Sequence, residues 1–191
     1  MSKKLIRETV IAEALDLLDE VGLDGITTRQ LAKRIGVEQP SLYWHFRKKD
    51  ELLAAMAEAA MAPHATAPLP MAADDWRGWF LDNTRSFRRT LLMRRDGARL
   101  HAGTYPGAPD VERITHKIAF LVACGLPEQD AKMAMLAASR FTVGSVLEEQ
   151  AASSSAAPSE LIGIPQIDHE TAFEEGLALI LDGLAARKRP A

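Results

Sequence analysis

Residues 25–46 read GITTRQLAKRIGVEQPSLYWHF, and the helix signals within this stretch decide the fold. Thr27 followed by Gln30 forms a capping box, which predicts the start of a helix, and Gly36 predicts its end. Pro40 suits the first turn of a second helix, where its missing N–H does no harm. Two short helices joined by a tight glycine-containing turn are typical of a helix-turn-helix motif.

Helical periodicity continues on both sides of this motif. Residues 5–21 and 50–62 place apolar side chains at three- and four-residue spacing, which predicts an amphipathic helix before the motif and another after it. Further helices are predicted over residues 74–95, 110–124, 128–151 and 169–186, and the second of these carries Val111, Ile114, Ile118 and Leu121 at helical spacing. Breaks rich in proline, glycine or serine are predicted at residues 63–70, 96–107 and 151–166. We find no strand pattern in the sequence, so the predicted class is all-α.

Composition narrows the class of protein. The chain has 191 residues, of which 47% are hydrophobic and 26% charged, as in a soluble globular protein. Its single cysteine, Cys124, cannot form an internal disulfide, and residues 1–10 lack the apolar stretch of a signal peptide. We therefore expect a cytoplasmic protein that does not enter a membrane.

Charge is distributed unevenly along the chain. The net charge is -3, yet residues 25–49 contain only one acid, Glu38. The basic residues of this segment are Arg29, Lys33, Arg34, Arg47, Lys48 and Lys49. A cationic patch on an acidic protein indicates a negatively charged partner, and the phosphates of DNA are the obvious candidate.

The second helix of the motif, predicted over residues 39–45, is the one that enters the major groove in helix-turn-helix proteins. The Gln39 amide can pair with adenine, whereas Leu42 and Phe46 are better placed for the core. An aromatic cluster is more often core than DNA surface, but a seven-residue helix is too short to bury every ring. The candidate DNA-contacting residues are Thr28, Arg29, Gln39, Pro40, Ser41, Tyr43, Trp44, His45 and Lys49.

The stretch LDGITTRQLAKRIGVEQPSLYWHFRKKDELL resembles the DNA-binding domain of the TetR family of transcriptional regulators, and SFRRTLLMRRDGARLHAGTYP and SRFTVGSVLEEQ resemble the family's ligand-binding core. The resemblance implies a DNA-binding domain at residues 1–49, a connecting helix and linker at 50–70, and a ligand-binding and dimerisation domain at 71–191. It also implies a homodimer on palindromic operator DNA, closed by a four-helix bundle built from residues 128–151 and 169–186. Ligand binding would move the fourth helix and release the operator.

The resemblance further implies a pocket for a small, flat, polycyclic inducer of the tetracycline type. Its residues would be His64, Asn83, Phe87, His101, Thr104, Tyr105, Pro106, Lys117 and Glu148. If the ligand is a Mg²⁺ complex, His101 would coordinate the metal directly and Glu148 of the partner subunit would act through water. No resident cofactor is implied.

Two of these residues depart from the family pattern, because Tyr105 replaces an arginine and Lys117 replaces a glutamine. A lysine beside a bound cation is unfavourable, so a Mg²⁺ complex and a metal-free ligand both stay open. Two other classes also stay open. One is a constitutive DNA-binding regulator with a non-functional pocket. The other is a metal-dependent enzyme, which is disfavoured because the sequence contains no nucleophile elbow, phosphate loop or HExxH-type cluster.

Overall fold

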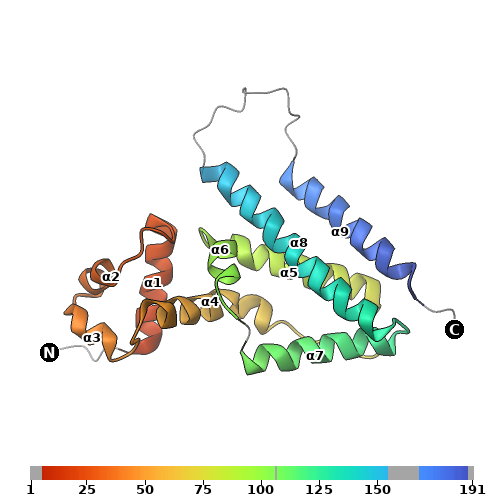
Figure 1. Cartoon of the computed structure of the whole chain (residues 1–191), viewed down its shortest axis with the longest axis horizontal. Helices are drawn as coiled ribbons and strands as arrows, with labels where there is room; N and C mark the ends of the chain where they lie inside the picture. The colour runs from red at the N-terminus through yellow and green to blue at the C-terminus, as the bar shows by residue number, and fades with distance from the viewer. Residues whose placement is uncertain (1–5, 106, 155–167, 189–191) are drawn as a thin grey trace. The chain divides into compact units, whose positions relative to one another are not determined.

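The computed structural model describes residues 6–105, 107–154 and 168–188, and every regular element in these ranges is a helix (Figure 1). The helices are α1 (Arg7–Val21), α2 (Thr28–Ile35), α3 (Gln39–Tyr43), α4 (Lys49–Ala65), α5 (Trp76–Leu92), α6 (Gly97–Ala102), α7 (Ala108–Ala123), α8 (Glu128–Ser154) and α9 (His169–Ala185). The predicted all-α class is confirmed. Pro106 and most of the link predicted at 151–166 lie outside the described residues.

The chain forms two compact units, each built from two stretches of sequence. The first unit combines residues 1–65 with residues 90–105, and the second combines residues 66–89 with residues 106–191. The polypeptide therefore enters the second unit, returns to the first for sixteen residues including α6, and leaves again. The domain boundaries expected from the resemblance stay a prediction.

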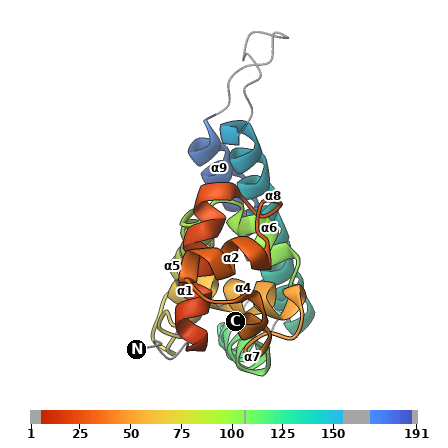
Figure 2. The same ribbon diagram turned by 90° about the vertical axis from the view of Figure 1, so that its left-hand side faces the viewer.

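The first unit packs α1, α2, α3 and α4 around one apolar core. Figure 2 shows α1, α2 and α4 of this unit. Leu18 of α1, Leu31 of α2 and Met56 of α4 are fully buried there, as the helical periodicity predicts. Leu100 of α6 joins the same core from far along the chain. This contact explains why a short helix forms where the sequence predicts only a break, since burial of α6 compensates for its weak local signals.

The helix-turn-helix forms through the residues that predict it. The Thr27 hydroxyl oxygen accepts the backbone N–H of Gln30 at 3.2 Å and caps α2. Gly36 ends the helix in the left-handed region, at φ 78°, where a side chain would be strained. Helix α3 is two residues shorter than predicted, because the N–H groups of His45 and Phe46 both turn back to the carbonyl of Leu42.

The second unit packs α5, α7, α8 and α9 around a separate core. Helices α8 and α9 approach closely at Gly176, where a Cβ atom would lie 2.5 Å from the Phe141 ring, so no larger residue fits without movement. Next to this point Phe141 stacks on Phe173, with ring centroids 5.4 Å apart. The close approach makes α8 and α9 a tightly packed pair (Figure 1).

Helix α7 buries Lys117, Phe120 and Leu121, whereas Val111 and Ile114 are exposed. Lysines are rarely buried, so the apolar spacing of this helix does not by itself show which of its sides faces the core.

Candidate functional site

Residues 42–46, at the end of α3 and just after it, divide into buried and exposed side chains as the sequence predicts. Leu42 and Phe46 are buried, and the Phe46 side chain is covered by the Arg7 guanidinium, 4.9 Å from the ring centroid. Trp44 is 90% exposed and Tyr43 is also exposed. A tryptophan side chain that is almost fully exposed to solvent is available to contact a binding partner.

Gln39, at the first position of α3, is held by the preceding helix. Its Nε2 donates to the Thr28 hydroxyl oxygen at 2.8 Å. This bond leaves the second Nε2 hydrogen and the Oε1 oxygen for a ligand, which is the donor–acceptor pair that an adenine edge complements. Pro40 lies beside it and is exposed, while Ser41 is half-buried.

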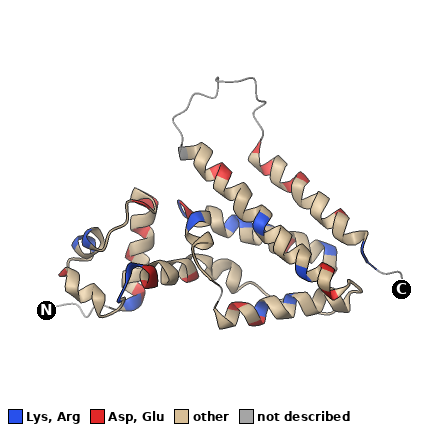
Figure 3. Cartoon of the chain, viewed as in Figure 1, with Lys and Arg blue, Asp and Glu red and all other residues tan. Residues whose placement is uncertain are grey.

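Figure 3 marks in blue where lysines and arginines lie along the ribbon. The side chains of those in the motif differ in their surroundings. Arg29 and Lys49 are exposed. Arg34 instead contacts two acids of α1, Glu13 at 2.9 Å and Glu20 at 2.7 Å. The hydrogen bonds that Arg34 donates to these carboxylates, first to Glu20 and then to Glu13, raise the pKa of Arg34. Arg34 therefore joins α2 to α1, a role that its place in the cationic run did not predict.

The ligand residues predicted in the first unit lie on α4, on α6 and just after α6. His64 and His101 are half-buried, and the Thr104 hydroxyl donates to the carbonyl of His101 at 2.9 Å. Tyr105, one of the two departures from the family pattern, is 97% exposed. His101 lines a small hollow whose walls include Ala60, Met61, Leu91 and Arg94, with no room for a water molecule.

Residues 94–99, which lead into α6, are tied to the end of α1 by a group that we call the arginine clasp: Arg94, Arg95, Asp96 and Arg99. Arg94 contacts Asp19 at 2.6 Å, Arg95 donates to the carbonyl of Glu20 at 2.9 Å, the N–H of Leu23 donates to Asp96 at 2.8 Å, and Arg99 contacts Asp24 at 2.9 Å. The clasp was not predicted. Its sequence signal is a run of acids at 16–24 and a run of arginines at 94–99.

The ligand residues predicted in the second unit lie on three helices. Asn83 and Phe87 are on α5, where Phe87 is buried and Asn83 half-buried, and Glu148 is exposed on α8. Lys117 is on α7 and only 7% exposed. Burial, and secondarily the charge of Arg113, lowers the pKa of Lys117 to about 8.

Two neighbours of Lys117 fix the segment before α5. Arg113 donates to the carbonyl of Ala67, and the His116 Nε2 lies 3.1 Å from the carbonyl of Pro70. These contacts satisfy backbone oxygens of a proline-rich stretch that forms no helix of its own. They also hold the middle of α7 against this stretch.

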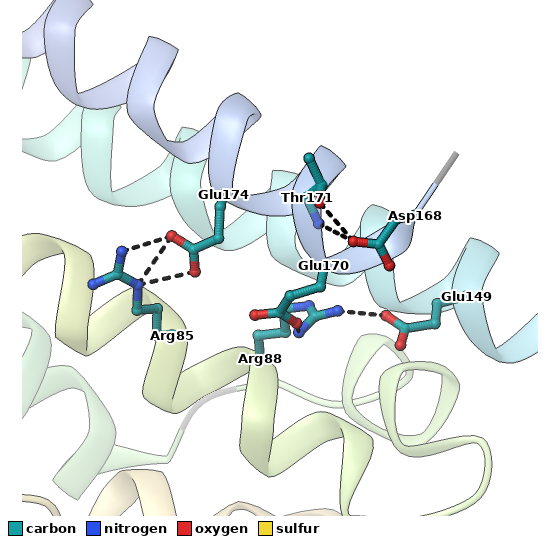
Figure 4. Close-up of polar contacts among 7 residues, drawn as sticks. All are labelled: Arg85, Arg88, Glu149, Asp168, Glu170, Thr171 and Glu174. Atoms are coloured by element: carbon teal, nitrogen blue, oxygen red, sulfur yellow. Dashed lines mark hydrogen bonds and ion pairs between the residues drawn. The ribbon is translucent and has the colours of Figure 1, made fainter. Parts of the chain in front are cut away.

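A second unpredicted network joins α5 to the facing ends of α8 and α9 (Figure 4). Arg88 contacts Glu149 at 2.8 Å and also contacts Glu170, while its guanidinium lies 4.9 Å from the centroid of Phe173. One turn earlier, Arg85 contacts Glu174 at 2.6 Å. Two arginines three residues apart on α5 thus pair with two glutamates four residues apart on α9. Both spacings are visible in the sequence, but the sequence alone does not show which arginine pairs with which glutamate.

Among residues 6–105, 107–154 and 168–188, no group of three or more histidine, cysteine, aspartate or glutamate side chains is arranged to hold a metal ion. No helix among them is both long and apolar enough to cross a membrane.

Comparison with known proteins agrees with this arrangement. Residues 10–56 match the family model described as bacterial regulatory proteins, tetR family, and residues 67–161 match the tetracyclin repressor-like C-terminal domain. The chain is 50% identical over 200 residues to the class A tetracycline repressor protein of transposon 1721 from Escherichia coli, covering 97% of this chain and 93% of that protein.

Two solved structures are also similar. SCO0253, a TetR-family transcriptional regulator from Streptomyces coelicolor, is 67% identical, with a TM-score of 0.75 over 95% of this chain and 98% of that one. The class A TetR in complex with 5a,6-anhydrotetracycline and magnesium is 50% identical, with a TM-score of 0.81 over 94% and 98%. These relatives are regulators and not enzymes, so the chain belongs to the TetR family of bacterial transcriptional regulators and carries both its DNA-binding domain and its tetracycline-repressor-like C-terminal domain.

Proposed function

We propose that the protein is a transcriptional repressor that binds a palindromic operator as a homodimer and releases it on binding a small polycyclic molecule. The observation that carries the DNA-binding part is the division of residues 42–46, in which Phe46 is 5% exposed and Trp44 is 90% exposed. The buried Phe46 ring fixes the motif, and the exposed polar-edged rings are left for phosphates. The protein would act in the cytoplasm. A single cysteine, which cannot form an internal disulfide, fits this reducing compartment.

On the operator, Gln39 would read an adenine in the major groove from the start of α3, with its amide placed by Thr28. Pro40 and Ser41 would contact a thymine methyl group or a phosphate. Arg29 would reach a guanine or the backbone, and Lys49 would hold phosphate at the start of α4. Tyr43, Trp44 and His45 would contact phosphate oxygens through their polar edges.

Dimerisation would use α8 and α9. Their exposed apolar side chains include Met133 and Leu136 on α8 and Leu179 on α9, which a second copy could cover. A dimer reads two half-sites about one helical turn apart, and this multiplies the affinity of a single weak motif. The four-helix bundle implied by the family resemblance is consistent with these exposed faces.

Ligand response would pass through α6. His101 and Thr104, two of the proposed ligand residues, are at the end of α6. Helix α6 packs on α4, and the arginine clasp ties its leading residues to α1. A ligand that shifts α6 would therefore act on α1 and α4, the two helices on either side of the helix-turn-helix motif. Movement of these helices would lower the affinity for DNA.

The ligand class follows from the relative solved with 5a,6-anhydrotetracycline and magnesium. A flat polycyclic molecule would pack on Phe87, with Asn83 and His64 bonding its polar edge. Magnesium, if carried by the ligand, would meet His101 and the partner's Glu148. Lys117 does not fit such a complex, because a buried ammonium repels a bound divalent cation.

A mobility-shift titration tests the DNA-binding part, with operator fragments that the protein selects from a random duplex library. We expect affinity to fall steeply with salt, and Gln39→Ala and Lys49→Ala to weaken binding. Lys132→Ala is the matched control, since this exposed lysine is on α8 beside Glu128. Salt-independent binding, or binding unchanged by the two motif substitutions, would contradict the proposal.

A thermal-shift screen against polycyclic compounds tests the sensing part. A ligand-dependent rise in melting temperature, together with loss of operator binding, is expected. A protein that binds operator but responds to no compound would be the constitutive regulator considered above.

A further inference from the structure

Arg7, the first residue of α1, lies against the end of the helix-turn-helix motif. Its guanidinium carbon is 4.9 Å from the centroid of the Phe46 ring. The Phe46 side chain is buried, whereas Arg7 is exposed to solvent. A guanidinium that lies over a ring gains a cation–π attraction and keeps its N–H donors in its own plane, where a third group can reach them. The contact therefore fixes the position of Arg7 without using its hydrogen-bond donors.

The arginines of the first unit differ in whether acids neutralise them. Arg34, Arg94 and Arg99 each form ion pairs with carboxylates. In the part of the chain that the structure describes, Arg7 and Arg29 form none. Arg29 is already a proposed DNA contact, and Arg7 has the same property although it lies outside the motif. A cation that no acid of its own domain neutralises is available to a negatively charged partner.

Further cations lie close to Arg7. The Phe46 ring that it covers is followed directly by three exposed basic residues, 47–49, and α1 packs on α4, which the last of these begins. Glu51, in the first turn of α4, accepts the backbone N–H of Arg47 at 2.8 Å. Like charges that gather in this way repel one another, and a phosphate group offsets the repulsion.

We infer that Arg7 binds a phosphate group of the operator backbone, with its guanidinium held in place by the Phe46 ring. The inference rests on the DNA-binding function proposed above, and it extends the DNA-contacting surface from the helix-turn-helix to the start of α1. A guanidinium can bind two phosphate oxygens at once, so Arg7 fixes the orientation of the first unit on the duplex. Phosphate contacts carry no base information, so Arg7 contributes to the affinity for every sequence alike, unlike Gln39.

The salt dependence of operator binding tests the inference, because each phosphate contact adds to the slope of log K against log salt concentration. Fluorescence anisotropy measures binding of the full-length protein to a labelled operator duplex at a series of salt concentrations. Arg7→Gln removes the charge, and Arg7→Lys keeps it. Arg89→Gln is the matched control, because Arg89 is exposed on α5 and belongs to the second unit.

Arg7→Gln is expected to lower the slope by roughly two, since a dimer loses one phosphate contact in each subunit, and to weaken binding by roughly ten- to a hundredfold. The loss should be the same on operators that carry a changed base. Arg7→Lys should keep the slope, and Arg89→Gln should keep both the slope and the affinity. An unchanged slope in Arg7→Gln overturns the inference. If only the melting temperature falls, Arg7 merely covers the Phe46 ring.

A double-mutant cycle tests the positioning role of Phe46. Phe46→Leu keeps an apolar side chain in the core of the first unit but removes the ring face on which the guanidinium lies. The substitution should weaken operator binding in the wild type, and by a smaller factor in the Arg7→Gln background. Equal factors in the two backgrounds overturn the positioning role, because Phe46 would then act only through the packing of the motif.

The behaviour of the wild type separates this inference from the function on which it rests. A wild type that binds no duplex, or binds without salt dependence, contradicts the proposed DNA-binding function, and the inference fails with it. A wild type with a steep salt slope that Arg7→Gln leaves unchanged contradicts only the inference.

Discussion

Arg88 on α5 contacts Glu149 on α8 at 2.8 Å, and the arginine side chain is only 6% exposed where it does so. The same guanidinium contacts Glu170 on α9 and covers the ring of Phe173. One buried cation thus joins three helices, close to the end of α8 and the start of α9 (Figure 4).

Replacing Arg88 by methionine should destabilise the protein by about 3 kcal/mol, because it leaves the partly buried Glu149 without its partner. Arg85→Met should cost at most about 1 kcal/mol, since Arg85 is 36% exposed and its pair with Glu174 is more screened by solvent. Urea unfolding followed by circular dichroism measures both. Equal losses for the two variants would contradict a special role for Arg88.

Trp44 and Phe46 should respond oppositely to truncation. Phe46→Ala removes a buried ring from the first unit and should cost about 3 to 5 kcal/mol of stability. Trp44→Ala removes an exposed ring, so it should leave the melting temperature unchanged and weaken operator binding. Calorimetry and mobility shift together separate the two effects. A Trp44→Ala protein with unaltered affinity for DNA would remove Trp44 from the reading surface.

Thr28→Val should relax base preference at a single operator position, because the Gln39 amide loses the oxygen to which it donates. The expected loss is about 1 kcal/mol for the preferred base, and Thr28→Ser should restore it. Binding to a set of operators with every base at each position measures this. A uniform loss across all sequences would mean instead that Thr28 contacts phosphate directly.

Stability should rise with pH in the window set by Lys117. Its pKa is about 8 in the folded protein and near the ordinary 10.5 when unfolded, so the unfolded chain binds more protons between these values. The penalty of burying the charge is present in full below pH 8 and is relieved by about 3 kcal/mol as the pH rises through the window. Lys117→Met should lack this rise in urea unfolding from pH 7 to about 10. A Lys117→Met curve parallel to the wild type would contradict the assignment.

Asp96 has two structural roles, one in the backbone and one in its side chain, and three substitutions distinguish them. It adopts the left-handed region at φ 55° and accepts the N–H of Leu23 at 2.8 Å. Asparagine keeps both abilities and should be nearly neutral. Glycine keeps only the backbone freedom, and alanine keeps neither, so Asp96→Ala should cost most, about 2 kcal/mol. Thermal melting ranks the three, and a glycine variant as stable as the wild type would show that the bond to Leu23 contributes nothing.

The sequence predicts the helix-turn-helix well because its signals are local. Thr27, Gly36 and Pro40 act on their own neighbours, so their effect needs no knowledge of the rest of the chain. Helix α6 was not predicted because its stability comes from Leu100, which packs into a core formed by residues far earlier in the sequence.

Contacts between residues far apart in the sequence limited the prediction of the site in the same way. The charges of Arg88 and Glu149 are visible in the sequence, but their contact depends on how α5 and α8 pack. Lys117 was assigned to the ligand site only through the family resemblance, and its burial contradicts the usual preference of lysine for solvent. Exposure of Trp44 was predictable because a helix as short as the one predicted over residues 39–45 cannot bury every ring.

The first unit has a consequence for protein engineering, because it is not encoded by one continuous stretch. Residues 90–105 supply Leu100 to its core and the arginine clasp to α1. A DNA-binding fragment that ends after residue 65 would therefore expose part of its core. It would also lose the partners of Asp19 and Leu23. Chimaeras that aim to redirect this regulator to another operator should exchange α2 and α3 alone, and keep α1 matched to the arginines with which it pairs.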